Sequence, residues 1–239
     1  MEQFLALGFV VGMGHALEAD HLAAVGALSA KKASRKRLAL LGATWGLGHT
    51  ITLFALCAAV IFLGLVLTER LSAALEFSVG IMLVVLGFQV VFKMRRKKVH
   101  FHVHDHGDGH RHIHAHSHEE SKVAHSADAH EHKHAKGFPL KALLVGLVHG
   151  AAGSAGLIAL ALAATRDSWA ALSYVAAFGI GSIIGMALLT LAASWPLGYA
   201  QSGTGWLFKG TQMAIAAIAI WIGVSVMLET GPVAFSSAA

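Results

Sequence analysis

The chain alternates between long apolar runs and short polar connections. Each apolar run is long enough to cross the ~30 Å hydrocarbon core of a bilayer as a helix rising ~1.5 Å per residue. The runs lie at 4–28, 38–67, 71–92, 139–164, 169–195 and 207–228. This pattern predicts an all-α integral membrane protein with six transmembrane helices.

Composition supports the same class. Hydrophobic residues make up 56% of the chain and charged residues 13%, about half the ~25% of soluble domains. The net charge of +5 is concentrated in KKASRKR (31–37) and KMRRKK (93–98), beside apolar runs and without interleaved aromatic residues. Clusters of this kind orient a protein in the bilayer, so we expect lipid and no nucleic acid as a partner.

Two further features fit a membrane helix bundle. Cys57 is the only cysteine, which excludes an internal disulfide or a thiolate cluster, and we expect it to fill space within a helix. The first residues, MEQFLALGFV, lack the basic region and cleavage site of a signal peptide. We therefore expect the first apolar run to be retained as a span.

Basic residues predict the orientation. Loop 29–37 holds five, 93–141 holds ten, and Lys209 lies in the last internal connection, whereas the other side has only Arg70 and Arg166. The positive-inside rule then places the long loop in the cytoplasm and both termini outside, in the inner (cytoplasmic) membrane.

The two halves of the chain are similar. The matches, in the same order, are GFVVG (8–12) with GLVHG (146–150), WGLGH (45–49) with FGIGS (178–182), and VLGF (85–88) with WIGV (221–224). Three spans per half would insert the second half in the opposite direction, giving a 3+3 inverted repeat. Such repeats are typical of transporters, whose site lies near the midplane.

This repeat divides the chain into three parts. The first three-helix membrane half is 1–92, a His-rich cytoplasmic loop is 93–138, and the second three-helix half is 139–239.

Ionisable residues interrupt the apolar runs. The first run carries His15, Glu18, Asp20 and His21, and other runs carry His49 and His149. Such groups are costly in a membrane and usually mark an ion or proton path. Imidazole and carboxylate ligands suit nickel, cobalt or zinc. The alternative is a buried hydrogen-bonded network that holds the helices together.

A straight helix cannot direct all of the first run's polar groups to one ion. At ~100° per residue, Asp20 lies about 140° and His21 about 240° around the helix from His15. The pairs His15–Glu18 and Glu18–His21 do share a face. Either the helix breaks near the glycines that precede His15, or the ligands divide between two sites or two shells. We favour the break, which is common at transporter sites.

The segment HALEADH (15–21) has the form His, four residues, Asp, His. In this it resembles the nickel/cobalt transporter family, most closely the six-span permeases of the urease-accessory type. WGLGHTITL (45–53) resembles the family's second signature, and GLVHGAAGSAGL (146–157) the corresponding urease-accessory segment. Gly14 stands where many members have arginine, and Glu18 where many have aspartate.

The resemblance implies that His15, Asp20, His21 and His49 line the metal path. Glu18 and His149 are further candidate ligands from the residues themselves. The second half offers Ser154 and Ser182 and no matching carboxylate.

The long loop is rich in histidine. Its composition is too polar for a packed core, so we expect it to be disordered and to gather metal ions in interchangeable ways. Its histidines are His100, His102, His104, His106, His110, His112, His114, His116, His118, His125, His130, His132 and His134. The alternative is a solvated spacer.

These features predict a secondary transporter, not an enzyme, that moves Ni2+ or Co2+ (with Zn2+ also suited) and carries no prosthetic group. The sequence has no Gly-rich, Lys-Ser/Thr phosphate loop. Uptake is the favoured direction, with metallochaperones or urease and hydrogenase maturation proteins as possible partners. Efflux, with the loop collecting cytoplasmic metal, is the alternative. A remote one is an intramembrane serine hydrolase that uses Ser154, but the last two spans offer no histidine base.

Overall fold

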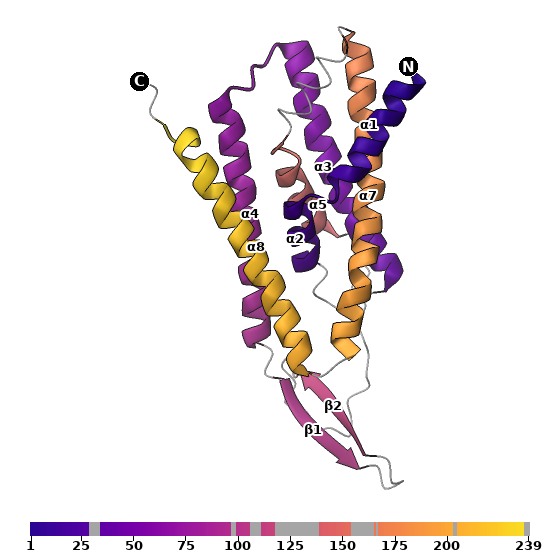
Figure 1. The fold of residues 1–239 in the computed structure, drawn as a ribbon, viewed down its shortest axis with the longest axis vertical. Helices are drawn as coiled ribbons and strands as arrows, with labels where there is room; N and C mark the ends of the chain where they lie inside the picture. The colour runs from indigo at the N-terminus through magenta and orange to yellow at the C-terminus, as the bar shows by residue number, and fades with distance from the viewer. Residues whose placement is uncertain are drawn as a thin grey trace.

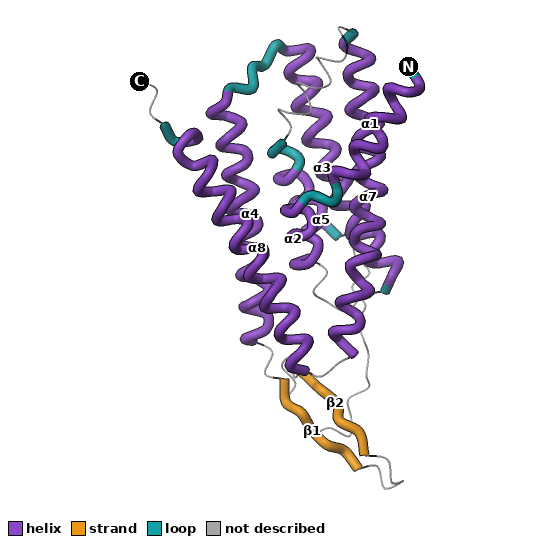
Figure 2. The backbone as a smooth tube through the Cα atoms, viewed as in Figure 1, coloured by secondary structure: helices purple, strands orange, loops and turns teal. Residues whose placement is uncertain are grey.

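The computed structural model describes residues 1–28, 34–96, 99–105, 111–117, 139–153, 165, 167–202 and 205–236. These residues form a bundle of helices with one two-stranded hairpin (Figures 1 and 2). The helices are α1 (Glu2–His15), α2 (Ala19–Leu28), α3 (Arg35–Leu63), α4 (Glu69–Arg96), α5 (Leu140–His149), α7 (Ser168–Ser202) and α8 (Gly205–Ala234). The strands are β1 (Val99–Asp105) and β2 (Arg111–Ser117).

Among the described helices, four are long and apolar enough to cross a membrane. Their qualifying ranges are Arg35–Leu63, Glu69–Arg95, Ser168–Ser194 and Phe208–Ala234, and they correspond to four of the six predicted runs. Large apolar side chains stay exposed on them, including Phe88, Ile180 and Trp221. Apolar surface of this extent is expected where helices face lipid rather than water.

The first predicted run is divided into two helices. α1 ends at His15 and α2 begins at Ala19, with a turn between them. The favoured break is therefore present, but it follows His15 instead of preceding it. Asp20 lies in the first turn of α2, where a carboxylate complements the positive end of the helix dipole.

The fourth predicted run is also interrupted. α5 is short and ends at His149, and residues 150–153 form a turn. Residues 154–164, which the sequence assigned to the remainder of this span, lie outside the described residues.

The helices pack in pairs along the bundle. α4 lies against α8, α3 against α7, α1 against α7 and α5 against α3. Both termini lie at one end of the bundle, and the hairpin lies at the other (Figure 1). Cys57 is fully buried in α3 among apolar side chains, as its predicted role as filler requires.

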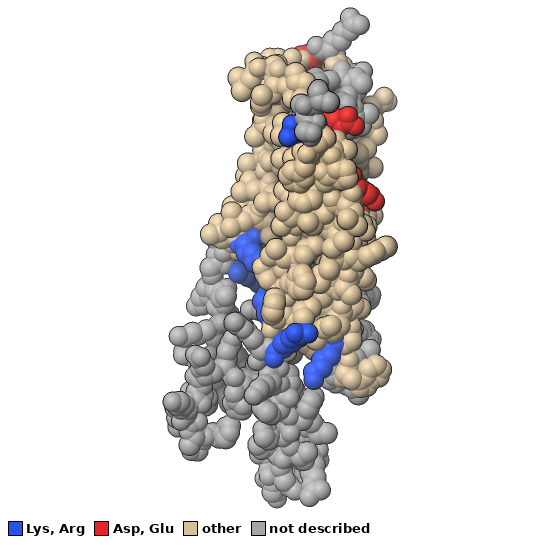
Figure 3. All heavy atoms as spheres, turned by 90° about the vertical axis from the view of Figure 1, so that its left-hand side faces the viewer, with Lys and Arg blue, Asp and Glu red and all other residues tan. Residues whose placement is uncertain are grey.

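Basic residues gather toward the hairpin end. Figure 3 shows this distribution on the face formed by α4 and α8. Residues near helix ends on that side are Arg35, Lys36, Arg37, Lys93, Arg95, Lys141 and Lys209. At the opposite end, Arg70 Nε donates to the carbonyl oxygen of Ala234, at 3.1 Å.

The hairpin differs from the sequence prediction, which expected the loop to be disordered. β1 and β2 pair antiparallel, and three histidine pairs face each other in the register: His100 with His116, His102 with His114, and His104 with His112. Both segments place histidine at every second residue, and a two-residue period is the period of a strand. The prediction of disorder was based on composition and did not use this two-residue period.

Candidate metal-binding site

Four histidines from four helices meet in the middle of the bundle. His15 ends α1, His21 lies in the first turn of α2, His49 lies in the middle of α3, and His149 ends α5. The break after α1 lets the first run contribute two of them, because α2 changes the direction of the chain before His21.

Their rings lie close together. The ring centroids of His21 and His149 are 4.1 Å apart, those of His15 and His21 4.6 Å, and those of His15 and His49 5.1 Å. Trp45 closes the cluster on the α3 side, with its ring 5.4 Å from that of His21. Sequence reasoning had not assigned Trp45 a role; its place one helical turn before His49 was the available signal.

The cluster is buried. His21 and His49 are each 1% exposed and His149 is 2% exposed, whereas the side chain of His15 is 18% exposed. Burying imidazole without satisfying its nitrogens is costly, so the partners of each nitrogen decide what the cluster can do.

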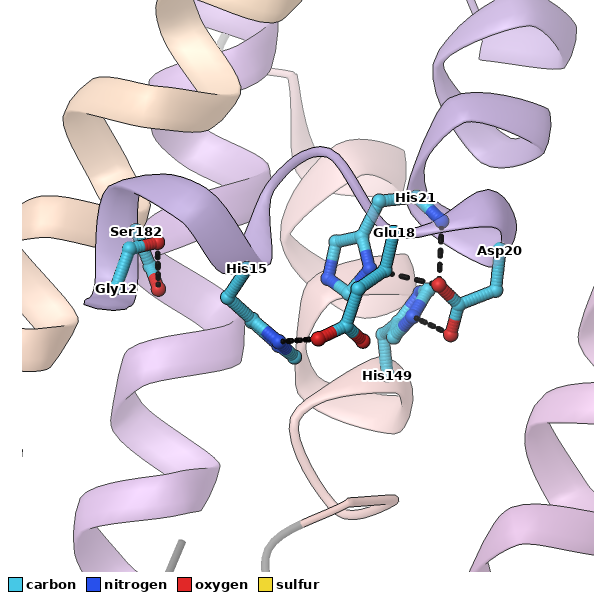
Figure 4. A network of polar contacts seen from close by, with 7 residues as sticks. All are labelled: Gly12, His15, Glu18, Asp20, His21, His149 and Ser182. Carbon is cyan, nitrogen blue, oxygen red and sulfur yellow. Dashed lines mark hydrogen bonds and ion pairs between the residues drawn. The ribbon is translucent and has the colours of Figure 1, made fainter. Parts of the chain in front are cut away.

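Asp20 links two of the histidines (Figure 4). Its Oδ1 lies 2.9 Å from Nδ1 of His21 and accepts a 2.7 Å hydrogen bond from the His21 backbone N–H. Its Oδ2 lies 3.0 Å from Nε2 of His149. A carboxylate that holds one nitrogen of a histidine orients the ring and leaves the other nitrogen free for a metal.

Several ring nitrogens have no hydrogen-bond partner among the described residues. They are Nε2 of His21, both nitrogens of His49, and Nδ1 of His149. The imidazoles are therefore not satisfied by one another. Buried polar atoms are almost always paired in native proteins, and a bound cation would satisfy these nitrogens.

Spacing permits such a cation. The groups His15, His21, His49 and Asp20, His21, His149 each offer donor atoms that lie within 4.8 Å of one another. Metal–nitrogen bonds of about 2 Å place the donors of one ion roughly 3–4 Å apart, so small side-chain movements would complete either group.

Two helix ends also favour a positive charge here. α1 and α5 both terminate at a histidine of the cluster. The C-terminal end of a helix carries partial negative charge, and broken helices in transporters use such ends to coordinate cations.

Glycines bring α5 against α3 beside the cluster. A Cβ added to Gly146 would overlap the carbonyl oxygen of Trp45, and one added to Gly150 would overlap that of His49. Only glycine lets the two backbones come this close. The close packing of α5 on α3 places His149 beside His21 and His49.

The remaining candidates belong to neither donor group. Glu18 Oε1 lies 2.7 Å from Nδ1 of His15, but the Glu18 side chain is 56% exposed and belongs to neither donor group. Ser182 Oγ donates to the carbonyl oxygen of Gly12 at 3.2 Å (Figure 4), so it joins α7 to α1.

The histidines of the long loop lie away from the cluster in the sequence. Six of them occupy paired positions in β1 and β2. Ser154 and seven histidines lie outside the described residues: His106, His110, His118, His125, His130, His132 and His134.

Comparisons with known proteins give one relevant relative. The chain is 34% identical over 197 residues to the urease accessory protein UreH of Bacillus sp. (strain TB-90). The aligned region covers 80% of this chain and 76% of that protein. No family model matches the chain, and no solved structure matches it.

Proposed function

The chain belongs to the urease-accessory (UreH) type of the nickel/cobalt transporter family, and on that premise we propose that it is a secondary transporter of Ni2+. It is a multi-pass membrane protein. The proposal assigns the buried cluster to the transported ion, which exchanges water for protein donors inside the bundle. Co2+ and Zn2+ suit the same donors.

One observation carries the proposal. Four histidines and one aspartate converge within apolar helices, and four of their buried ring nitrogens lack a hydrogen-bond partner among the described residues. A packing network would satisfy those nitrogens internally. A cation path leaves them available and recovers the burial cost when the ion binds.

The proposed pathway uses six crossings. α1 and α2 would form one broken span and α5 would belong to a second, beside α3, α4, α7 and α8. The basic residues at the hairpin end support a cytoplasmic location for that end and an external location for both termini.

The proposed direction is uptake. The relative's name links it to urease, and a nickel enzyme in the cytoplasm needs imported metal. Urease maturation proteins or a metallochaperone would then receive the ion. Efflux is the second candidate, because the histidine hairpin lies at the basic end, where it could collect cytoplasmic metal for export.

Radiolabelled Ni2+ flux in proteoliposomes of known orientation tests the proposal. We expect the wild-type chain to carry Ni2+, and His21→Ala to lower the flux by at least about 100-fold because it removes the central donor. Thr190→Val is a matched control, because it also changes a fully buried polar residue. Among the described residues, the Thr190 hydroxyl donates to the Met186 carbonyl at 2.7 Å, within α7.

Three outcomes decide between the alternatives. No flux by a folded wild-type chain contradicts nickel transport, and unchanged flux in His21→Ala contradicts this site. In cells, deletion of the protein should lower nickel accumulation; a higher accumulation would establish efflux instead.

A further inference from the structure

The donors around His21 form two overlapping sets. His15 and His49 complete one set, and Asp20 and His149 complete the other. Within the described part of the chain, His21 is the member that both sets share. Each set has three donors, too few to complete the coordination of a divalent first-row ion without water or a further group.

The two nitrogens of His21 have different surroundings. Nδ1 lies 2.9 Å from Asp20 Oδ1, in the second set. Nε2 is buried and unpartnered among the described residues, so it is the nitrogen available to the first set. Ions bound on both sides of one imidazole would be about 6 Å apart, given bonds of about 2 Å. Two divalent charges repel strongly at that distance in a low-dielectric interior, so the sets would be filled one at a time.

His15 and His149 have matching local structures. Each is the last residue of a short helix, and each is followed by a turn closed by two backbone hydrogen bonds of the same pattern. After α1 these are Leu17 N–H to Gly14 O at 2.9 Å and Glu18 N–H to His15 O at 3.1 Å; after α5 they are Ala151 N–H to Val148 O and Ala152 N–H to His149 O, both at 3.2 Å.

Their helices also pack in matching ways. A Cβ on Gly12 of α1 would overlap the Phe178 carbonyl of α7, and one on Gly181 of α7 would overlap the Phe9 carbonyl of α1. The contacts between α5 and α3 repeat this arrangement.

In that second pair of helices, a Cβ on Gly146 would overlap the Trp45 carbonyl, and one on Gly48 would overlap the Leu143 carbonyl. By these contacts, Gly12 of the first half corresponds to Gly146 of the second half, and His15 therefore corresponds to His149. The match of GFVVG with GLVHG had aligned Gly8 with Gly146, so the structural alignment of α1 with α5 is shifted by one helical turn. The alignment of WGLGH in α3 with FGIGS in α7 is unchanged.

The matching helices approach from opposite ends. α1 runs inward from the end that holds the termini, whereas α5 runs inward from the hairpin end (Figure 1). Each broken helix thus delivers one terminal histidine to His21 from its own side of the bundle.

We propose that His15 and His149 are equivalent residues of two inverted halves, and that a single ion passes between them on His21. The ion is bound first by the set that contains one of these histidines and then by the set that contains the other. Asp20 belongs to the set with His149 and holds His21 Nδ1, while Nε2 serves the set with His15 and His49. This inference rests on the proposed function, because it describes how the same site handles its nickel ion.

The test separates binding from flux. The background is the full-length chain with all thirteen histidines of 100–134 replaced by asparagine, so that the loop does not bind the Ni2+ probe. In this background, His15→Gln, His149→Gln and His21→Gln are compared for Ni2+ binding by equilibrium dialysis and for flux in proteoliposomes. Thermal unfolding in detergent verifies that each variant is folded.

We expect the background chain to bind one Ni2+. His15→Gln and His149→Gln should each keep one ion with an affinity within about 10-fold, yet lose at least about 100-fold in flux, because each retains one intact set and lacks the other. His21→Gln should lose both binding and flux. Nickel X-ray absorption should show fewer histidine ligands in His15→Gln than in His149→Gln, because the set left in the former includes Asp20.

Two results would overturn the inference. Parallel losses of binding and flux in His15→Gln and His149→Gln would indicate one undivided site, and two ions bound per chain would exclude alternating occupancy. Neither result would contradict nickel transport itself. A background chain that neither binds nor carries Ni2+, although wild type carries it, would place the essential donors in the loop and would overturn the inference as well. Absence of transport by wild type would contradict the proposed function.

Discussion

His149 Nε2 lies 3.0 Å from Asp20 Oδ2, although 129 residues separate them along the chain. The contact joins the first turn of α2 to the end of α5, and the other oxygen of the same carboxylate holds His21. One acidic side chain therefore fixes two of the four clustered imidazoles. Removing the Asp20 carboxylate should therefore lower Ni2+ flux, because two histidines lose the group that orients them.

Asp20→Asn should lower Ni2+ flux by at least about 10-fold, because the carboxylate orients two metal-binding histidines and is itself a donor of one set. The carboxylate offers two acceptor oxygens to His21 and His149, whereas the amide offers one acceptor and one donor. Flux in proteoliposomes measures the loss, and circular dichroism verifies that the helices remain.

Glu18→Gln is the matched comparison, since it makes the same chemical change two residues earlier. Glu18 is more than half exposed and contacts only His15 within the described cluster. Exposed ion pairs contribute little, so flux should change by no more than about three-fold. Equal losses in the two variants would contradict the central position of Asp20.

The sequence indicated which polar residues meet better than how they are arranged. Ionisable residues in apolar runs are conspicuous, so His15, Asp20, His21, His49 and His149 could be singled out, and all five meet in the structure. Sequence reasoning raised a division between two sites only as the alternative to a helix break, and it could not predict that the two sets overlap at His21. The overlap depends on the turn between α1 and α2 and on the position of α5, which brings His149 to Asp20.

The helix break shows a related limit. Angular spacing indicated that a straight helix could not bring His15 and His21 together, and glycine content suggested a break before His15. The turn instead follows His15, at Ala16–Glu18. Gly12 is used for close packing against Phe178, and sequence alone does not distinguish a glycine that permits contact from one that ends a helix.

Gly12→Ala should destabilise the bundle, whereas Gly14→Ala should not. The added methyl at Gly12 would overlap the backbone of Phe178, which cannot move as a side chain can, but at Gly14 nothing lies within 4 Å of the Cβ position. Overpacking of this kind costs about 1–3 kcal/mol, and alanine is otherwise the better helix former. Thermal unfolding in detergent should show a lower midpoint for Gly12→Ala only. Similar midpoints for the two variants would mean that α1 does not pack this closely on α7.

Competition between ions should follow the donor chemistry of the cluster. Co2+ and Zn2+ should inhibit Ni2+ flux at comparable concentrations, because all three accept imidazole nitrogen. Mg2+ and Ca2+ prefer oxygen ligands, and even about a thousand-fold excess should have little effect. Flux of labelled Ni2+ at fixed concentration measures each inhibition. Strong inhibition by Mg2+ would indicate that carboxylates, and not His15, His21 and His49, dominate the path.

Exchanging His102 with Val103 should weaken metal binding by the hairpin without changing the number of histidines. His102 lies opposite His114 in the register, and Val103 lies opposite Ile113. Neighbouring residues of a strand lie on opposite faces, so the exchange separates one histidine pair. The same exchange of His132 with Lys133, elsewhere in the loop, is the control. Equilibrium dialysis in a His21→Gln background isolates the hairpin, and we expect about a two- to ten-fold weaker affinity for the first exchange alone. Equal affinities in the two exchanges would show that the number of histidines, and not their register, determines binding.

Because the hairpin lies at one end of the bundle and the cluster in its middle, the His102–Val103 exchange made in the otherwise wild-type chain should leave maximal Ni2+ flux intact.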